Sequence, residues 1–269
     1  MNKGCEVGPL AAAFFVVSMW ASPTIAQDEG FFSGRTASVT IGPYFRASVG
    51  SAEPSFDSGY WRPPGFIPDP EIRFDIDGDS VVTGTIAFGY DWQGWRGELA
   101  FSHFGASSAS GPCSSASDGS SCATHADIDN AKVESTAVMT NVYYAPFEAR
   151  GSQSVFQPFI VGGVGFAGNR MGDWTRSNPG ATRPIRTFEG NLNTSFAWSV
   201  GVGASYQVTK PGRWPVLIEG SWRYYDLGSA EGGAQPLPGN GASQPVQPLK
   251  FDMQHSVFEF GVRIPLQKF

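Results

Sequence analysis

Eight separate segments of this chain alternate apolar and polar side chains. Such a period of two predicts β-strands with one apolar face. A long gap follows the first, third, fifth and seventh segments, and a short gap follows the others. After the apolar run near the N-terminus, no stretch approaches the roughly 18 uninterrupted apolar residues of a spanning helix. A membrane could therefore be crossed only by strands of a closed barrel. The alternating segments are 37–49, 80–92, 95–105, 133–145, 154–167, 195–208, 215–227 and 253–266.

The pattern predicts an all-β fold, an eight-stranded antiparallel transmembrane up-and-down β-barrel with short periplasmic turns and four long extracellular loops. The composition fits an exported β protein, with 34 glycines, 14% aromatic residues and only 16% charged residues. No Pro/Ser/Ala-rich linker divides the chain, although its length would also allow two small β-domains. The net charge of −6 argues against a nucleic-acid partner.

The tightest hairpin can be aligned residue by residue. A two-residue turn at Gln93-Gly94 places Trp92 opposite Trp95 and Asp91 opposite Arg96. One face is then apolar, with two indoles at its turn end, and the other face is small, polar and charged. In a soluble sandwich another sheet would cover the apolar face, whereas in a barrel it meets lipid with tryptophan at headgroup level.

The last two strands give a second register. One alignment places Arg223 opposite Glu259 and, at the same time, Glu219 opposite Arg263. In a narrow lumen such groups must pair, because an isolated buried charge costs several kcal/mol. The alternative is exposed ion pairs on a soluble sheet, worth less than about 1 kcal/mol. The predicted lumen charges are Arg96, Glu98, Glu219, Arg223, Glu259 and Arg263, together with Arg46.

Small residues mark the inward face of two further strands. In 196–206 the aromatic and β-branched residues alternate with Ala, Ser and Gly, and 156–166 repeats the pattern with Gly163 and Gly165. A tight lumen accepts such residues, although close packing in a sandwich would too. The predicted membrane-interface aromatics are Trp92, Trp95, Trp198, Trp222 and Phe269.

The N-terminus predicts export. Lys3, an apolar run over 9–21 and the small residues around Ala26 form a secretory signal peptide over 1–26, which leaves a β-barrel domain over 27–269. A transmembrane anchor is the alternative, but the run is too short. In an exported chain, Cys113 and Cys122 predict a disulfide closing a short loop. Two free thiols are the alternative, and the spacing does not suit zinc.

At this point the chain resembles the eight-stranded barrels of the OmpA-type and surface-antigen (opacity-like) superfamily of the Gram-negative outer membrane. The resemblance rests on the N-terminal signal, on 157–165, 198–203 and 222–228, and on the ending at Phe269, and it covers most of the mature chain. None of these segments is a catalytic motif, so the resemblance implies an architecture rather than an activity. We expect no C-terminal peptidoglycan-binding domain.

The C-terminal strand departs from the pattern. Its apolar face runs through Phe260, Val262, Ile264 and Leu266, which is out of phase with Phe269. Phe269 could face lipid only if a bulge or an unpaired tail near 267–268 shifted the register.

Candidate sites for chemistry are few. Asp69, Glu71, Asp75, Asp77 and Asp79 resemble part of a calcium loop, but the glycine is one position early and the distal glutamate is missing. A solvated acidic rim is the expectation. Of the histidines, His103 and His255 lie beside Ser102 and Ser256 without forming a lipid A deacylase signature.

The long loops contain the residues that a partner would recognise. The arginines of the third long loop, Arg170, Arg176, Arg183 and Arg186, could contact lipopolysaccharide phosphates. The loop residues are Tyr60, Trp61 and Phe66, the segment 113–122, Arg170, Trp174, Arg176, Arg183 and Arg186, and the segment 229–248.

Together these observations predict an integral protein of the Gram-negative outer membrane with a structural or surface-interaction role. No enzymatic activity, cofactor or metal is expected. Eight strands enclose a lumen that side chains fill, which argues against a pore. The alternatives are a narrow porin-like channel and a lipid-modifying enzyme. The expected partners are membrane lipid, lipopolysaccharide and, through the C-terminal strand, the assembly machinery, and the protein is expected to be a monomer.

Overall fold

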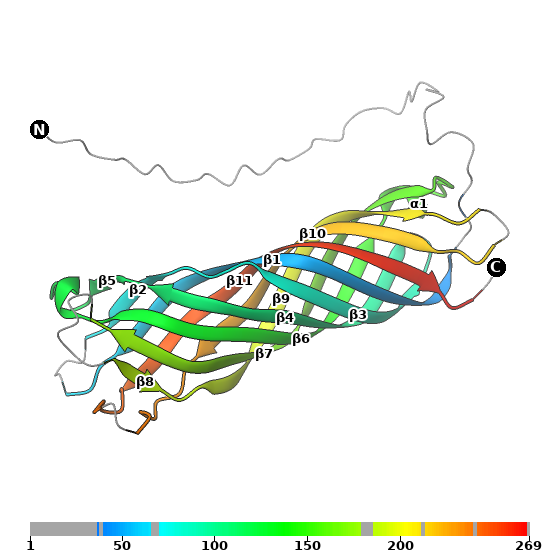
Figure 1. Cartoon of the computed structure of the whole chain (residues 1–269). Coiled ribbons are helices and arrows are strands. Elements are labelled where there is room, and N and C mark those ends of the chain that lie inside the picture. Colours follow the sequence, from blue (N-terminus) through cyan, green and yellow to red (C-terminus); the bar gives the residue numbers. More distant parts are fainter. Residues whose placement is uncertain are drawn as a thin grey trace, which may run out of the picture. The chain divides into compact units, whose positions relative to one another are not determined.

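Eight long antiparallel strands close into a barrel in the computed structural model of this chain (Figure 1). Each strand pairs with its neighbours in chain order, and the last pairs with the first. The structure describes residues 37, 40–65, 70–178, 185–210, 213–238 and 241–267. The eight strands are β1 (Gly42–Arg62), β3 (Val81–Asp91), β4 (Trp95–Gly111), β6 (Asp127–Tyr144), β7 (Phe156–Ser177), β9 (Asn191–Gln207), β10 (Leu217–Glu231) and β11 (Gln247–Pro265).

One end of the barrel carries short connections and the other carries long ones, as the gaps between the alternating segments predicted. The end that we call the turn end contains the turn at 92–94, the short helix α1 (Pro146–Ala149) and the connection 208–216. The other end, the loop end, contains the short strands β2 (Ile72–Ile76), β5 (Cys113–Ala116) and β8 (Arg186–Phe188) and the 3-10 turn η1 (Cys122–Thr124). The predicted barrel fold is therefore confirmed, but the long loops contain strands of their own.

Within the described residues, no helix has the length and apolar character needed to span a membrane.

The β3–β4 hairpin has the predicted register. Asp91 lies opposite Arg96 and Gly89 opposite Glu98. Gln93 and Gly94 both have positive φ, 64° and 88°, as a type I′ turn requires. The turn closes where the Trp92 amide donates to the Trp95 carbonyl at 2.7 Å. The two-residue turn is sufficient to fix the register of this pair.

The predicted register of β10 and β11 is wrong by two residues. Glu259 lies opposite Ser221, and Arg263 lies opposite Leu217. An even shift keeps every side chain on its face, so the charged residues still point inward. The prediction paired opposite charges directly across the ladder, whereas these groups meet diagonally and across the lumen.

Most strands are longer than a membrane requires. β7 has 22 residues and β1 has 21, whereas about 9–11 residues cross a bilayer. At about 3.3 Å per residue and a tilt of about 40°, a strand like β7 advances roughly 55 Å, against an apolar band of about 25 Å. About half of the barrel therefore extends beyond the membrane.

β-Bulges explain why the predicted strands are too short. Register shifts fall between Phe104 and Ser107, between Ala131 and Val133, and between Asp226 and Ser229. The predicted boundaries at 105, 133 and 227 coincide with these bulges, because a bulge breaks the period of two. Residues assigned to loops are therefore in strands: Tyr60 and Trp61 in β1, Arg170, Trp174 and Arg176 in β7, and Arg186 in β8.

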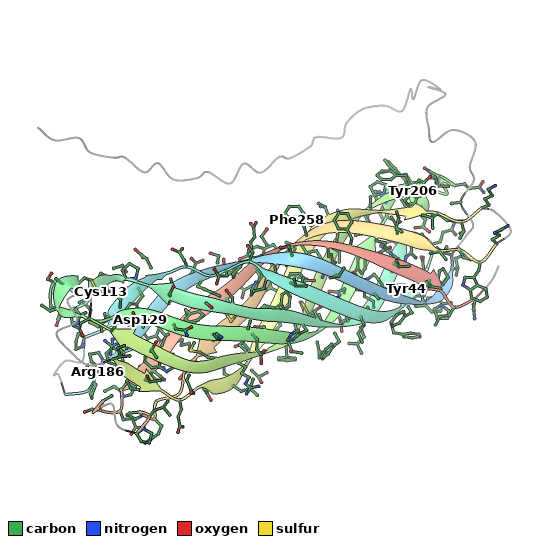
Figure 2. The ribbon with its side chains drawn as sticks, viewed as in Figure 1. Tyr44, Cys113, Asp129, Arg186, Tyr206 and Phe258 are labelled. Atoms are coloured by element: carbon green, nitrogen blue, oxygen red, sulfur yellow. A yellow bond between two sulfur atoms is a disulfide. The ribbon has the colours of Figure 1, made fainter. Side chains whose placement is uncertain are left out.

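The barrel has opposite polarity in its two halves. In the turn-side half, where β1 runs from Gly42 to Val49, large apolar side chains point outward and are exposed, while the inward face is charged. Figure 2 shows Phe258 on this outer surface. The exposed residues include Phe45, Val49, Ile86, Phe88, Leu99, Phe101, Val138, Val142, Ile160, Val164, Val200, Val202, Ile218, Phe260 and Val262. So large an apolar surface, closed around a barrel, is a lipid-facing surface.

In the loop-side half, where β1 continues from Ala52 to Arg62, the outward residues are polar and the interior is apolar. Glu53, Asp57, Lys132 and Arg170 are exposed on the outside. One continuous cluster of buried side chains fills the inside, including Phe56, Trp61, Ile72, Phe74, Phe104, Ile128, Val133, Met171, Trp174, Phe188, Leu249, Phe251 and Met253. This half is built like a soluble protein, with its core inside and water outside.

The interior of the loop-side half should supply much of the stability. Phe104 is 1% exposed and packs against Tyr225 and His255 at centroid distances of 5.3 and 5.1 Å, whereas Phe101 in the same strand is 47% exposed on the outer face. Phe104→Ala should lower the free energy of unfolding by about 3 kcal/mol. Phe101→Ala should cost under about 1 kcal/mol, because lipid or detergent replaces the lost contacts. Urea unfolding in detergent measures both, and equal losses would contradict the inside–outside assignment.

Candidate functional site

A neutral set of eight buried charges occupies the lumen of the turn-side half. Four arginines and four carboxylates point inward, which gives a net charge of zero. They come from β1, β3, β4, β10 and β11, which are adjacent strands of the closed sheet. The structure places every predicted lumen charge here and adds Asp91. The set is Arg46, Arg96, Arg223, Arg263, Asp91, Glu98, Glu219 and Glu259.

Glu98 is the centre of the network. Arg46 donates two hydrogen bonds to its carboxylate, from Nη2 at 2.7 Å and from Nε at 3.1 Å. Tyr143, Asn141 and Tyr44 donate three more, at 2.6, 3.1 and 3.2 Å. Both oxygens are thus saturated by donors from two strands, β1 and β6. The three neutral partners were missed, although alternation places all of them on the inward face.

A second group lies nearer the turn end. Glu219 accepts from Arg96 at 2.6 Å and from Arg263 Nε at 2.9 Å. Arg263 Nη1 also contacts Asp91 at 2.8 Å, and the Thr40 hydroxyl donates to Asp91 at 3.1 Å. Thus the predicted Glu219–Arg263 pair forms, in a group of four charges rather than alone.

Glu259 is held mainly by hydroxyl groups. Ser48 and Ser221 donate to it at 2.9 and 3.0 Å, and Arg46 Nη1 lies at 3.6 Å. Ser221 lies directly opposite Glu259 in the ladder. Arg46 therefore joins Glu98 to Glu259.

Arg223 makes a longer contact with its predicted partner. Its Nη1 lies 3.9 Å from Glu259, while its Nη2 donates to Ser199 at 2.7 Å and to Asn141 at 2.9 Å. The guanidinium carbon lies 4.8 Å from the centroid of the Tyr225 ring. Arg223 is thus placed between the charged network and the apolar core.

The network leaves little free volume. The cavity between Arg46, Tyr143, Glu219 and Glu259 measures about 10 Å³. A single water needs about 10–15 Å³ by this measure. This cavity is therefore no larger than a single water molecule.

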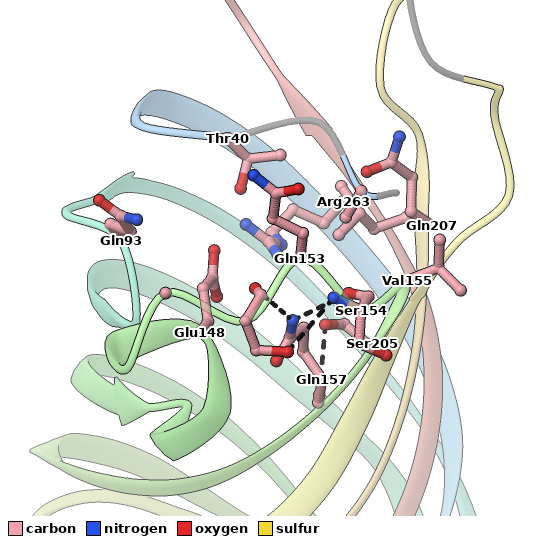
Figure 3. A pocket seen from close by; sticks show the side chains of 14 residues that line it. Thr40, Gln93, Glu148, Gln153, Ser154, Val155, Gln157, Ser205, Gln207 and Arg263 are labelled. Carbon is pink, nitrogen blue, oxygen red and sulfur yellow. Dashed lines mark hydrogen bonds between the residues drawn. The ribbon is translucent and has the colours of Figure 1, made fainter. Parts of the chain in front are cut away.

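The turn end is covered by the segment 145–155. Gln157 donates to the carbonyls of Ser154 and Ser152 at 2.8 and 3.2 Å. A cavity of about 70 Å³ lies between this segment and the barrel, with Glu148, Gln153 and Arg263 around it (Figure 3). Burial, and secondarily the charge of Asp91, raises the pKa of Glu148.

An aromatic layer closes the apolar core at the loop end. Trp174 stacks on Phe188 at 4.3 Å between centroids, and Trp61 meets Trp174 edge-on at 6.3 Å. The guanidinium carbon of Arg176 lies 3.4 Å from the centroid of Trp61. Trp61 and Trp174, predicted to be available to partners, are buried at 4% and 0% exposure.

Above this layer lies a larger cavity, which we call the loop-end cavity. Its volume is about 400 Å³, and it is lined by Trp61, Arg176, Arg186, Phe188, Asp118, Ser120, Thr124 and His125 among others. Figure 2 shows Arg186 at this end of the barrel, with Cys113 and Asp129. The segment holding Ser120 is bounded by the Cys113–Cys122 disulfide, whose Cα atoms are 5.5 Å apart, so the predicted disulfide is confirmed.

A Ser–His contact lies in the wall of this cavity. Ser120 Oγ is 2.6 Å from His125 Nε2, and its hydroxyl donates to Asp118 at 2.6 Å. Because the hydroxyl proton is used for Asp118, Nε2 must donate to Ser120 Oγ. The hydrogen bonds from Ser120 lower the pKa of Asp118. This orientation is the reverse of a nucleophile activated by a histidine base.

The other two histidines do not pair with the serines beside them in the sequence, as a catalytic role would require. His103 points outward, with Nδ1 3.2 Å from Thr136 Oγ1, whereas Ser102 points inward and bonds Thr85. His255 is buried in the lumen, stacked on Phe104. Neighbouring residues on one strand face opposite sides, so sequence adjacency does not bring these groups together.

The acidic segment of loop one is partly neutralised. Glu71 accepts from Arg62 and Arg73, each at 3.0 Å, and these hydrogen bonds lower its pKa. Asp77 forms a backbone bridge with Ser110. Asp69 lies outside the described residues. Among the residues that are described, no three His, Cys, Asp or Glu side chains form a metal-binding group.

Aromatic side chains lie near both limits of the apolar band. Trp92 and Trp95 are exposed at the turn, where Trp95 contacts Tyr144 at 4.5 Å. Trp198 and Trp222 point outward near the other limit, and Trp222 Nε1 donates to Ser256 at 2.8 Å. The predictions for Phe269, Phe66, Arg183 and the signal peptide fall outside the described residues.

Comparison with known proteins finds similar structures only. No protein-family model matches this chain. No curated protein matches it. Among solved structures, Neisserial surface protein A is 16% identical, with 84% of this chain and 97% of that chain covered and a TM-score of 0.45. The outer membrane protein OprG from Pseudomonas aeruginosa is 14% identical, with 86% and 98% covered and a TM-score of 0.47.

A third similar structure is Ail, the attachment invasion locus protein of Yersinia pestis, in complex with the heparin analogue sucrose octasulfate. It is 12% identical, with 83% of this chain and all of that chain covered and a TM-score of 0.35.

Breaking the Glu98 centre should be costly. Glu98→Ala leaves the Arg46 guanidinium buried without its two charge-assisted hydrogen bonds, so the free energy of unfolding should fall by about 3–5 kcal/mol. The double variant Arg46→Met/Glu98→Met should lose clearly less, because no unpaired charge remains. The exposed Glu53→Ala is the matched control, within about 0.5 kcal/mol of the wild type. If the double variant were as unstable as Glu98→Ala, the pair would not be the source of the effect.

Proposed function

We propose that this protein is an integral outer-membrane β-barrel with a structural or surface-interaction role, whose lumen is closed rather than conducting. The observation that carries the proposal is that side chains fill the interior of both halves of the barrel. Charged side chains fill the turn-side half and apolar side chains fill the loop-side half. A barrel filled in both halves serves to hold its outer end in place above the membrane.

The location follows from the outer surface. A closed ring of antiparallel strands with an exposed apolar band satisfies its backbone groups internally, as a lipid-spanning sheet must. Barrels of this kind belong to the outer membrane of Gram-negative bacteria, where turns face the periplasm and longer connections face outward. We assign the turn end to the periplasm, and we expect removal of residues 1–26 during export.

The interactions follow from the same surfaces. The apolar band contacts lipid, and the exposed Lys132 and Arg170 just beyond it suit the phosphates of lipopolysaccharide. β11 closes the ring against β1, so we infer that this C-terminal strand is also what the assembly machinery recognises. The closed ring leaves no free edge among its eight described strands, which supports a monomer.

The absence of an enzymatic role is also a proposal. It is supported by the separation of His103 and His255 from the serines beside them, and by the Ser120 hydroxyl donating to Asp118 rather than to His125. An altered lipid A profile in cells expressing the protein, lost in His103→Ala or His255→Ala, would favour a lipid-modifying enzyme instead.

A closed lumen should be visible electrically. Purified protein that shows heat-modifiable migration, and is therefore a folded barrel, should give no stable ion-selective channels in planar bilayers. Arg223→Ala and Glu259→Ala should stay silent too, because the apolar core still blocks the loop-side half. Stable channels in the wild type would refute the closed lumen and favour the porin-like alternative. Recovery of the protein as a soluble periplasmic monomer would refute the membrane location.

A further inference from the structure

The apolar outer surface contains a hollow, which we call the lipid-facing groove. It has a volume of about 780 Å³ and lies across β1, β11, β10 and β9, near the turn end. Its walls are outward side chains, among them Phe156, Ile218 and Phe260, which are 45%, 47% and 73% exposed. The groove therefore opens toward lipid and not toward the lumen.

Two small residues form the floor of the groove. Gly220 of β10 lies opposite Ala204 of β9, and Phe260 of β11 is the partner of Gly220 on its other side. One outward position nearer the turn end, Ile218 lies opposite Tyr206. Figure 2 shows Tyr206 near this end of the barrel. Because the side chains of one face stand in rows across the sheet, two small neighbours in a row leave a depression between larger ones.

The groove lies at the depth of one leaflet. The β9–β10 ladder begins where the Val208 amide donates to the Val216 carbonyl at 3.0 Å, and Gly220 follows Val216 by four residues. Four residues span about 13 Å along a strand, or roughly 10 Å along the membrane normal at a tilt of about 40°. A hydrocarbon core of about 30 Å gives each leaflet about 15 Å. The groove is therefore level with the acyl chains of the leaflet at the turn end.

Two exposed cations lie on the connection between the same two strands. Lys210 and Arg213 belong to 208–216, which joins β9 to β10, and the Arg213 amide donates to the Lys210 carbonyl at 3.2 Å. Neither forms an ion pair with a carboxylate of the described residues. Beside them, the exposed Trp214 donates from Nε1 to the Pro265 carbonyl at 2.8 Å. An indole held at the limit of the apolar band marks the level of the headgroups.

The exposed charge of the turn end is positive. Among the described residues of this end, Arg150, Lys210 and Arg213 are exposed, and Glu148 is a half-buried carboxylate. The other carboxylates at this level, Asp91 and Glu219, are buried in the lumen network. Exposed cations beside a membrane attract anionic headgroups.

We propose that the β9–β10 hairpin binds an anionic glycerophospholipid, with its phosphate at Lys210 and Arg213 and an acyl chain in the lipid-facing groove. At about 30 Å³ for each water-sized group, the groove has room for roughly two dozen methylene-sized groups, which is enough for one such chain. The site rests on the proposed function for the assignment of the turn end to the periplasm. With that assignment, the occupant is a phospholipid of the periplasmic leaflet.

Native mass spectrometry of the full-length, detergent-folded protein tests the site with dioleoyl phosphatidylglycerol. The titration should saturate at one tightly retained lipid per barrel, with an affinity that falls as salt rises. Dioleoyl phosphatidylcholine, which has the same chains and no net charge, should bind at least about fivefold more weakly. Glycerol 3-phosphate, which has the charge without the chains, should not compete at equal concentration.

The cations are tested by a double variant. Lys210→Gln/Arg213→Gln should weaken phosphatidylglycerol binding by about tenfold or more and remove the preference over phosphatidylcholine. Both residues are exposed, so their replacement should not prevent folding. Lys132→Gln/Arg170→Gln is the matched control, since it removes the same charge from the outer surface beyond the other limit of the apolar band.

The groove is tested by filling it. Ala204→Phe should weaken the binding of both lipids by about threefold or more, because the acyl chain loses several methylene contacts. The new ring faces lipid, so the barrel should still fold. Val200→Phe is the matched control, because Val200 lies on the same outward face of β9, is 48% exposed and does not line the groove.

The outcomes separate the two proposals. In heat-modifiable, folded protein, the absence of saturable binding, equal affinity for the two lipids, or equal weakening by either control would overturn the site and leave the membrane role intact. A dimer that loses the lipid as it forms would assign the groove to a second copy and would also overturn the site. Charge-dependent lipid binding by a protein recovered from the soluble periplasm would instead keep the site and refute the membrane role.

Discussion

Closure of the ring by β1 and β11 is the constraint on which the rest of this structure depends. The ladder runs without interruption from Tyr44 opposite Pro265 to Asp57 opposite Asp252. In lipid, an open edge would leave a row of unsatisfied backbone groups, each costing several kcal/mol. Once eight strands are closed, the interior is just wide enough for side chains to fill. Whether polar or apolar side chains fill each half then depends on whether its outer face is apolar or polar.

In the turn-side half the outer face is apolar, so polar residues face inward and must satisfy one another. Eight charges sum to zero, and Glu98 accepts five hydrogen bonds. In the loop-side half the outer face is polar, and the interior is a packed apolar core. The bulges in β4, β6 and β10 lie near the boundary between the two halves and bend the strands there. One sheet thus combines a membrane protein with a soluble one, and the loop-end cavity is built on the rigid core of the soluble half.

The sequence predicted those features of the fold that depend on residues close together in the chain. The Gln93-Gly94 turn fixed one register, and alternation assigned the faces of β3, β4, β7, β9, β10 and β11. The β10–β11 register failed because charge complementarity is satisfied equally well by diagonal and cross-lumen partners, as for Glu219 with both Arg263 and Arg96. The loop-side strand ends were missed because bulges interrupt the period of two. The pairing of Arg176 with Arg186 across the ladder depends on β8, a three-residue strand whose pairing no sequence pattern specifies.

The central claim is that the barrel passes from lipid to water halfway along its strands. Spin labels at outward positions of the folded protein in lipid vesicles test it directly, since Cys113 and Cys122 are joined in a disulfide. Labels replacing Phe88, Val200 and Val262 should be accessible to oxygen and shielded from a water-soluble nickel complex. Labels replacing Glu53, Lys132 and Arg170 should show the reverse. The same accessibility at both sets of positions would contradict the account, because the change of environment would then not follow the change in side-chain polarity.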